Sequence, residues 1–361
     1  MEQDTLEKAR LAIDEIDREL GRLFAARMEQ AALVAAYKAG QGLPVLDTGR
    51  EQAVIDRNLA RLPSDSPIRP YYSDFLKHNM ALSRSYQAAL LGRDTVAYQG
   101  APGAFAHLAL LRLFPHAKAL PLPAWEDVFR AVEKGDAAWG VLPFENSHVG
   151  DVSEVLDLCL AHPACYIHHM YDLPVSQNLL GLPGATLAGI RRVASHPQAL
   201  RQCADFLNRH GLKPEPQANT ALAAQYVSQA ADPSLGAIAS KETAALYGLD
   251  VLCANISQEP DNTTRFIGIS REKPTRGNRF CLLFTVRHEA GRLAKAVEAV
   301  SRLGYNMEAI KSRPLPHTAW AYYFYAELVG EPTEALFAAL ESQCSMVRLL
   351  GRYERENCHA D

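Results

Sequence analysis

The spacing of hydrophobic residues changes twice along the chain, and in the first stretch it predicts only helices. Apolar residues recur there at intervals of three and four along one stripe: Ile13, Ile16, Leu20, Leu23 and Val34. This pattern is typical of a long amphipathic helix with one buried face. We predict helices over residues 5–39 and 71–91, with another between them that begins near Asp47, a residue suited to be its N-cap.

Short apolar runs alternate with helical stretches between residues 94 and 270. Strands are predicted over residues 95–100, 137–144, 191–195, 236–240 and 265–270, and helices over residues 124–135, 153–162, 197–211 and 220–230. Alternation of this kind is typical of an α/β domain, and we expect its strands to be largely parallel.

A polar segment over residues 271–278 separates this region from a third pattern. Strands are predicted beyond it over residues 279–286, 306–314, 320–329 and 346–353, and helices over residues 290–304 and 332–343. The resulting order βαββαβ is that of a ferredoxin-like α+β module. We therefore expect a multidomain chain with domains at residues 1–92, 94–270 and 277–361.

One charged residue interrupts the apolar stripe of the first predicted helix. Arg27 lies one heptad after Leu20 and one heptad before Val34. A lone charge is costly to bury, so the ordinary explanation is a side chain that reaches solvent or pairs with a glutamate. Lys38 follows eleven residues later, which is three turns plus about 20°, so both cations point the same way. Such a pair is suited to hold a compact dianion.

Other polar residues of the helical stretch extend this cationic cluster. Ser83 and Gln87 form an i, i+4 pair on the last predicted helix of the stretch and share a face. Three charged residues gather at the start of the middle helix: Asp47, Arg50 and Glu51. Arg10 lies about 25 Å from Arg27 along the first helix, so it can join the same small ligand only from a second copy of the chain.

The composition excludes several classes of protein. The chain has 361 residues, a net charge of −4 and a pI near 6.3, so it lacks the basic character of a nucleic-acid-binding protein. No apolar run reaches the ~18 residues of a membrane span, and the N-terminal residues lack the features of a signal peptide. The seven cysteines form no CxxC pair, so neither a zinc site nor a disulfide framework is indicated. We expect a cytoplasmic protein.

Polar residues lie at the ends of the strands predicted for the α/β region, where ligands of open sheets gather. They form the segments Glu145-Asn146-Ser147, Ser195-His196 and Thr263-Thr264. An ordinary alternative exists for two positions, since Ser195 and Thr220 are also suited to be helix N-caps. The region has neither GxGxxG nor GK[ST], and the adjacent Ser195 and His196 do not have the spacing of a hydrolase dyad.

Together, the polar positions of residues 1–92 resemble the all-helical chorismate mutase domain at the front of bacterial P-proteins. The matched residues are Arg10, Arg27, Lys38, Asp47, Arg50, Glu51, Ser83 and Gln87. The resemblance implies the rearrangement of chorismate to prephenate in a homodimer with shared sites. In such a site, Arg27 and a second chain's Arg10 would bind the carboxylates of the substrate.

The same resemblance implies roles for the other matched residues. Lys38 and Gln87 would be the catalytic donors to the ether oxygen, on which negative charge grows as the bond breaks. Glu51 would bind the substrate hydroxyl. The remaining substrate-binding residues would be Asp47, Arg50 and Ser83.

The segments QGAPGAFAH, PFENS, SHPQAL and NTTRF resemble prephenate dehydratase over about residues 95–270. The resemblance implies two α/β lobes around a cleft, like those of periplasmic binding proteins. It also implies that prephenate loses carbon dioxide and its ring hydroxyl, without a cofactor or a metal, to give phenylpyruvate. Thr264 would be the catalytic proton donor, and Arg265 would bind a carboxylate. The other substrate-binding residues would be Glu145, Asn146, Ser147, Ser195, His196 and Phe266.

Residues 279–353 resemble an ACT domain, a sensor that in this family binds phenylalanine across a dimer interface. The family motifs GALV and ESRP read here Gly291-Arg292-Leu293-Ala294 and Lys311-Ser312-Arg313-Pro314. The implied effector-binding residues are Gly291, Leu293, Asn306, Ser312, Arg313 and Pro314. Lys311 reverses the charge of the motif, so phenylalanine control, altered control and a purely structural role all stay open.

These resemblances favour a bifunctional enzyme of phenylalanine biosynthesis with chorismate mutase, prephenate dehydratase and ACT regions in that order. We expect a homodimer that acts on small molecules and binds neither nucleic acid nor membranes. Two alternatives are a non-catalytic small-molecule sensor and a dehydratase that also accepts arogenate. The separate anion-binding helical stretch argues against the sensor.

Overall fold

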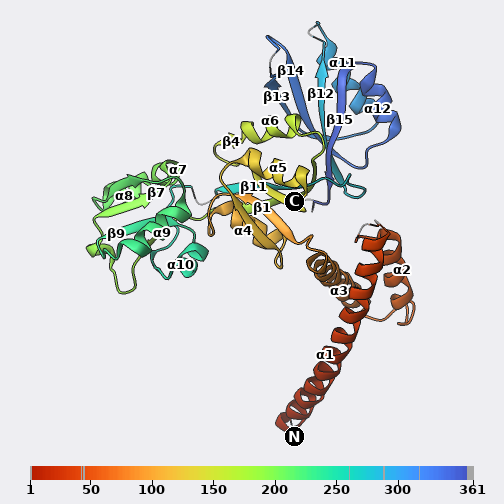
Figure 1. Cartoon of the computed structure of the whole chain (residues 1–361), viewed down its shortest axis with the longest axis horizontal. Coiled ribbons are helices and arrows are strands. Elements are labelled where there is room, and N and C mark those ends of the chain that lie inside the picture. The colour runs from red at the N-terminus through yellow and green to blue at the C-terminus, as the bar shows by residue number, and fades with distance from the viewer. Residues whose placement is uncertain are drawn as a thin grey trace. The chain divides into compact units, whose positions relative to one another are not determined.

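The computed structural model describes residues 2–355, apart from residues 42, 44, 260, 288 and 317 and the side chains of residues 2–4 and 48. Residues 356–361, which the sequence assigns to the last domain, lie outside the described part. Contacts divide the chain into two compact units, residues 1–94 and 95–361. Figure 1 shows the helices and strands of both units with the labels used below.

The first unit is helical, as the sequence predicted. Helix α1 spans Glu2–Gly40, α2 spans Thr48–Leu59 and α3 spans Arg69–Leu90. Asp47 is the N-cap of α2, because its Oδ1 accepts a hydrogen bond from the backbone N–H of Arg50 at 2.9 Å. A small apolar core joins α2 to α3 through Ile55, Leu76 and Met80.

The apolar stripe of α1 is exposed, which corrects the expectation that it is buried within the chain. Its residues are 45–58% exposed: Ile13, Ile16, Leu20, Leu23 and Val34. Among the described side chains of α1, Ala31 and Ala35 are buried, and they follow Arg27 at intervals of four residues and so extend its face. In Figure 1 the N-terminal half of α1 extends beyond α2 and α3, which explains why its apolar residues have no cover within the unit.

The second unit begins with an α/β lobe. Its sheet has the order β5-β11-β3-β1-β2. The strands are β1 (Thr95–Gln99), β2 (Lys118–Leu122), β3 (Trp139–Asn146), β5 (Tyr166–Pro174) and β11 (Thr263–Ser270), with the short β4 (Gly150–Asp151) beside β3. The helices are α4 (Phe105–Leu113), α5 (Trp125–Lys134) and α6 (Ser153–Ala161).

A second lobe is inserted between β5 and β11. Its sheet has the order β10-β6-β9-β7-β8. The strands are β6 (Asn178–Gly181), β7 (Arg192–Ser195), β8 (Lys213–Pro216), β9 (Leu235–Ala239) and β10 (Asp250–Cys253). The helices are α7 (Pro197–Gln202), α8 (Ala204–Arg209), α9 (Thr220–Ala230) and α10 (Lys241–Tyr247), with a 3-10 turn at Leu187–Gly189.

Both sheets are mixed, so the expectation of largely parallel strands is wrong. In the first lobe, β1 is parallel to β2 and β3, but β11 is antiparallel to both β3 and β5. In the second lobe, β7 is parallel to β8 and β9, but β6 is antiparallel to β9 and β10. The antiparallel strands β6 and β11 are the first strands after the chain crosses from one lobe to the other. The chain crosses from β5 to β6 and returns from β10 to β11, and each crossing reverses the strand direction.

The C-terminal part has the predicted order βαββαβ. It consists of β12 (Arg279–Val286), α11 (Arg292–Arg302), β13 (Met307–Pro314), β14 (Tyr322–Val329), α12 (Glu334–Glu341) and β15 (Cys344–Tyr353). The sheet order is β13-β14-β12-β15, and β15 also pairs with β5 of the first lobe through Gly351 and Ile167. Helices α11 and α12 pack on one face, while the other face shares an apolar core with the first lobe.

Candidate functional site

Arg27 is half-buried at the contact between α1 and α3. Its guanidinium donates hydrogen bonds to the Ser83 hydroxyl and, at 3.5 Å, to the carbonyl of Asn79. Burial lowers the pKa of Arg27 below its ordinary value. In the described part of the chain, neither partner of this arginine is a carboxylate, so its positive charge is not neutralised there.

Gln87 lies one turn beyond Ser83 on the same face of α3, as the i, i+4 spacing predicted. The side chain is 8% exposed, and its Oε1 has no hydrogen-bond partner among the described residues. Buried polar atoms without a partner are uncommon and costly, so such an atom is a candidate for contact with a ligand or water. The face of α3 next to Arg27 thus offers an unsatisfied amide.

The remaining predicted residues of this unit are distributed around α2 and α1. The Lys38 ammonium is half-buried and donates to the carbonyl of Val45 at 2.6 Å. Glu51 on α2 forms an ion pair with Arg84 on α3, a residue that the sequence reasoning missed although it follows Ser83 directly. Asp47 serves as the α2 cap, Arg50 is exposed, and Arg10 is exposed on the projecting half of α1.

In the second unit, the end of β3 and the start of β11 bring Asn146 and Thr264 together. The Asn146 Nδ2 lies 3.0 Å from the Thr264 hydroxyl and 2.7 Å from the Oδ1 of Asn262. The Asn146 Oδ1 accepts hydrogen bonds from the backbone N–H groups of His148 and Val149, at 3.1 and 3.0 Å. The amide is therefore held at both ends, and the turn after β3 fixes its orientation toward Thr264.

The alternation of side chains along the strands separates the predicted residues onto two faces of the sheet. Asn146 and Thr264 are directly opposite each other across β3 and β11. Glu145 and Arg265, one residue along, are the next opposed pair, and Asp172 on β5 continues their row. Successive side chains of a strand point to opposite faces, so Arg265 and Glu145 lie on the other face from Thr264.

Carboxylates surround Arg265 on that face. Its guanidinium donates to Asp172 at 2.8 Å and to Glu145 at 3.1 Å, and it lies 4.0 Å from Glu327 of β14. Burial, the largest influence, lowers the pKa of Arg265, but the hydrogen bond and charge of Asp172 and the charges of Glu327 and Glu145 outweigh it and raise that pKa. This arrangement argues against the expectation that Arg265 binds a substrate carboxylate beside Thr264.

Two other predicted residues are buried, and their side chains make contacts within the chain. Phe266 is 2% exposed in the apolar core between the sheet and α4, so its side chain supports the strand and is not exposed at a cleft. Ser195 is fully buried, and its hydroxyl donates to the carbonyl of Ile238 at 2.6 Å. Ser147 is exposed, and its hydroxyl accepts from the Thr263 N–H at 3.0 Å.

Unlike Asp47, neither Ser195 nor Thr220 is the helix N-cap that the sequence allowed it to be. His196 caps α7, because its Nδ1 accepts from the Gln198 N–H at 3.3 Å. Asn219, and not Thr220, caps α9 through its Oδ1. Burial, and then the charge of Arg201, lower the pKa of His196. Because Ser195 and His196 have separate partners, they form no dyad, as their spacing predicted.

The two lobes touch at a contact that the sequence reasoning did not foresee. The Thr243 hydroxyl on α10 donates to the carbonyl of Gly103 at 2.7 Å, and the Tyr247 hydroxyl donates to the carbonyl of Pro102 at 2.8 Å. Gly103 has φ +89°, and a Cβ there would lie 3.1 Å from Thr243. Only glycine suits both the backbone conformation and the close approach. The glycine-rich turn after β1 is thereby held against the second lobe.

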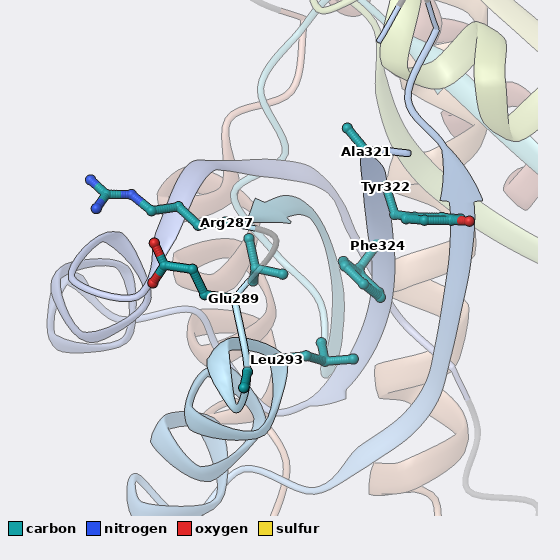
Figure 2. Close-up of a pocket in the computed structure, with 8 residues that line it drawn as sticks. Arg287, Glu289, Leu293, Ala321, Tyr322 and Phe324 are labelled. Carbon is teal, nitrogen blue, oxygen red and sulfur yellow. The ribbon is translucent and has the colours of Figure 1, made fainter. Parts of the chain in front are cut away.

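An open pocket of about 400 Å³ lies in the C-terminal part, between the end of β12, the start of α11 and β14. Figure 2 shows Arg287 and Glu289 on one side of it and Ala321, Tyr322 and Phe324 on the other. The remaining lining residues are Val286, Ala290 and Leu293. The pocket therefore combines one positive and one negative side chain with an apolar wall.

The predicted effector residues are only partly brought together. Leu293 lines the pocket, and Gly291, with φ +78°, caps α11 beside it. Arg313 points away from α11 and α12 and forms an ion pair with Asp157 of α6 at 2.6 Å. The carbonyl of Asn306 accepts a hydrogen bond from the Val329 N–H. Ser312 and Pro314 are exposed on β13. The two motifs thus lie apart within one chain.

Comparisons with known proteins assign both units to families. Residues 9–88 match the family model of chorismate mutase type II, and residues 96–274 match that of prephenate dehydratase. A bifunctional chorismate mutase/prephenate dehydratase of Neisseria gonorrhoeae is 33% identical over 357 residues, which cover 95% of each chain. An arogenate dehydratase/prephenate dehydratase of Arabidopsis thaliana is 34% identical over 280 residues, which cover 72% of this chain and 71% of the relative.

Solved structures resemble almost three quarters of the chain. A prephenate dehydratase from Arthrobacter aurescens in complex with L-Phe is 27% identical, with a TM-score of 0.66, and the match covers 72% of this chain and 90% of the other. A protein described as a quorum-quenching acylase is 32% identical, with a TM-score of 0.67, over 73% of this chain and 98% of the other. The described residues contain no helix that is long and apolar enough to cross a membrane. They also contain no cluster of three or more His, Cys, Asp or Glu placed to hold a metal ion.

Proposed function

The chain belongs to the family of bifunctional chorismate mutase/prephenate dehydratases, and we propose that its two active sites lie in different units. It is an enzyme of phenylalanine biosynthesis that rearranges chorismate to prephenate and converts prephenate to phenylpyruvate. The alternative of a non-catalytic sensor is therefore excluded. We assign the mutase to residues 1–92, the dehydratase to residues 94–270 and an ACT domain to residues 277–361.

The mutase proposal depends most on the half-buried guanidinium of Arg27, which has no carboxylate partner in the described part of the chain. A carboxylate of chorismate supplies the missing negative charge. A pericyclic rearrangement needs no nucleophile, so the site has to hold the folded conformer of the substrate and stabilise charge on the breaking ether bond. Arg27 performs the first task, with Ser83 fixing its orientation.

Lys38 and Gln87 are the proposed donors to the ether oxygen. The ammonium of Lys38 keeps two of its three N–H groups for a ligand when one is bonded to Val45. Rotation of the Gln87 amide exchanges the positions of its oxygen and its NH₂ group. The NH₂ group can then take the position of the oxygen, which has no partner in the described chain, and donate to the ligand. Glu51 accepts from the substrate hydroxyl at the α2 edge, where Arg84 positions it.

A second copy of the chain completes this site in our proposal. The exposed stripe of α1 is a face that is apolar over several turns, and such a face is stable in water only when it is covered. Arg10 lies on the same projecting half of α1, far from Arg27 along the helix. Packing of two α1 helices covers the stripe and brings the Arg10 of one protomer to the Arg27 of its partner.

The dehydratase proposal depends on the bond between Asn146 and Thr264. Because Asn146 donates to the Thr264 oxygen at 3.0 Å, the hydroxyl proton of Thr264 is left to be donated. In the reaction, the bond to the ring carboxylate breaks and its electrons complete the aromatic ring. The ring hydroxyl departs with the donated proton as water, and Thr264 regains a proton from solvent.

Substitution of Thr264 tests this assignment, and the mutase of the same chain serves as its control. Thr264→Ala is expected to lower the dehydratase kcat by about 100-fold or more, which is the usual contribution of a general acid. Thr264→Ser keeps the hydroxyl and is expected to retain most of the activity. Full dehydratase turnover by Thr264→Ala would remove the assignment, whereas parallel loss of both activities would indicate misfolding.

The pocket of the C-terminal sheet is the proposed effector site. Arg287 suits the carboxylate of a free amino acid, Glu289 suits its ammonium group, and Leu293 and Phe324 suit an aromatic side chain. The L-Phe complex of the Arthrobacter relative makes phenylalanine the first candidate. Titration with phenylalanine should inhibit the dehydratase, and Arg287→Ala should weaken that inhibition. No binding of phenylalanine at millimolar concentration would favour a purely structural module.

Two further proposals concern the substrate range of the dehydratase and the location of the protein. The Arabidopsis relative supports a dehydratase that also accepts arogenate, and a comparison of kcat/KM for the two substrates tests it. We also propose a cytoplasmic location, and fractionation of cells tests it.

A further inference from the structure

Lys311 lies where the C-terminal sheet meets the dehydratase lobe. It is on β13, on the face opposite to the helices, and its side chain is 13% exposed. The ammonium lies 3.0 Å from the Oε1 of Glu145, forms an ion pair with Asp151, and sits 5.4 Å from the ring centre of Phe144. A charge in such a place is stable only because carboxylates and an aromatic face compensate its desolvation.

Both carboxylates belong to one hairpin. Glu145 on β3 and Asp151 on β4 are directly opposite each other in that hairpin. Like charges at directly opposed positions destabilise a strand pair. Lys311 contacts both of them and so reduces their repulsion, as Arg265 does from the other side of Glu145.

The last residue of β3 in this hairpin, Asn146, orients Thr264. Asn146 follows Glu145 directly, and the turn holds its amide through the N–H groups of His148 and Val149. The Asn146 Nδ2 then contacts the Thr264 hydroxyl at 3.0 Å. A shift of the hairpin therefore changes the distance between these two groups, and catalytic geometry tolerates deviations of only about 0.5 Å.

We propose that Lys311 is a positioning residue for the dehydratase reaction, which it supports by holding the hairpin of Glu145 and Asp151 so that Asn146 meets Thr264. The inference rests on the proposed dehydratase site. It explains why a lysine stands where the family motif ESRP has glutamate, because a glutamate at position 311 would face two carboxylates. The residue that departs from the effector motif serves the active site of the neighbouring lobe.

Kinetics of the full-length chain test the proposal. Lys311→Met is expected to lower the dehydratase kcat by roughly tenfold to a hundredfold, with a smaller change in KM, because the contact between Asn146 and Thr264 matters most in the transition state. Lys311→Glu should lower it further, and Lys311→Arg should restore most of it. The chorismate mutase activity of each variant should equal that of the parent chain.

A second substitution separates positioning from a general loss of stability. Asp151→Asn in the Lys311→Met chain removes one of the two opposed charges, and the dehydratase kcat should recover by several-fold. Lys118→Met, at an exposed position of β2 in the same lobe, is the matched control and should leave kcat unchanged. A Lys311→Met chain with a dehydratase kcat within twofold of the parent, or no recovery on adding Asp151→Asn, would overturn the proposal.

The outcome is distinguishable from failure of the proposed site itself. If Thr264→Ala keeps full dehydratase activity, the site is assigned wrongly, whatever Lys311 does. If Thr264→Ala is inactive and Lys311→Met is unaffected, only the role of Lys311 is refuted.

Discussion

The two units differ in how completely one chain builds each site. In the α/β unit, Asn146 and Thr264 contact each other directly, and the residues around them are held by hydrogen bonds within the chain. In the helical unit, Arg27 lacks a carboxylate partner and Gln87 has an unsatisfied amide atom among the described residues, while the apolar stripe of α1 faces solvent. In our proposal, this difference makes the dehydratase site depend on the fold of one chain and the mutase site on a second copy.

The strongest test of this comparison removes the cation of the helical unit. Arg27→Ala is expected to lower the mutase kcat/KM by about 1000-fold, close to 4 kcal/mol, because a substrate carboxylate loses its half-buried partner. The conversion of prephenate should stay within twofold of the parent chain. Separate assays with chorismate and with prephenate measure the two effects. An equal loss in both would show that the units are not independent.

Mixing two inactive variants tests whether the mutase site is shared. Arg10→Ala and Arg27→Ala chains should each lack mutase activity, but a one-to-one mixture should recover about a quarter of the native value. Half of the dimers then are mixed, and each has one of two sites intact. Native mass spectrometry verifies the exchange of chains. No recovery after verified exchange would place Arg10 outside the site.

The contact between the lobes offers a smaller effect on the dehydratase alone. Thr243→Val keeps the shape of the side chain but removes the hydrogen bond to Gly103. One hydrogen bond is worth about 1 kcal/mol, so kcat/KM for prephenate should fall about fivefold. Thr285→Val, on β12 away from this contact, is the matched control. An unchanged kcat/KM would show that the contact does not support the active conformation.

The last expected effect is a pH dependence of stability, and not of catalysis, confined to the second unit. Burial, and then the charge of His168, lower the pKa of His169 to about 4, and its ring packs against Phe114 and Trp139. Since the unfolded state binds the proton more readily, stability is complete above pH 6.5 and falls by at most about 1.4 kcal/mol per unit as the pH drops toward 4. Urea unfolding at pH 7 and pH 5 measures the loss.

Two variants check the origin of this dependence. His169→Gln should make it shallower but not abolish it, because His107, His168 and His196 also have pKa values lowered by burial. The same change at the exposed His116 should leave it as it is. The helical unit has His78 as its single histidine, exposed on α3, so its unfolding should change little over the same range. An equal acid sensitivity of both units would contradict the assignment to His169.

The sequence predicted the helical unit and the order βαββαβ because their patterns are long and regular. Some missed elements are short or irregular: β8 reads KPEP and contains two prolines, and α4 is apolar on nearly all sides. The nine-residue β5 was missed as well. Their identity depends on partners that are distant in sequence. The mixed strand direction was missed for the same reason, since it follows from the path of the chain between the lobes.

Predicting the site was limited in a similar way. Site residues were predicted one by one from motifs. The motif TRF places Thr264 and Arg265 side by side, whereas the pleat of β11 separates them onto two faces. Thr243 and Arg84 were missed because their roles appear only through contacts with Gly103 and Glu51. Lys311 was noticed only as a departure from a motif, and its contacts with Glu145 and Asp151 join segments about 160 residues apart.

The pairing of β15 with β5 limits how this enzyme can be recombined. A Cβ at Gly351 would lie 2.4 Å from the carbonyl oxygen of Ile167, so the two backbones approach as closely as glycine allows. A chimera in which a foreign sensor replaced the C-terminal part would leave β5 as an unpaired edge strand of the first lobe. It would also expose half of the apolar core that the two parts share. A fusion point at residue 94, between the two compact units, leaves both units intact and is therefore the better place for engineering.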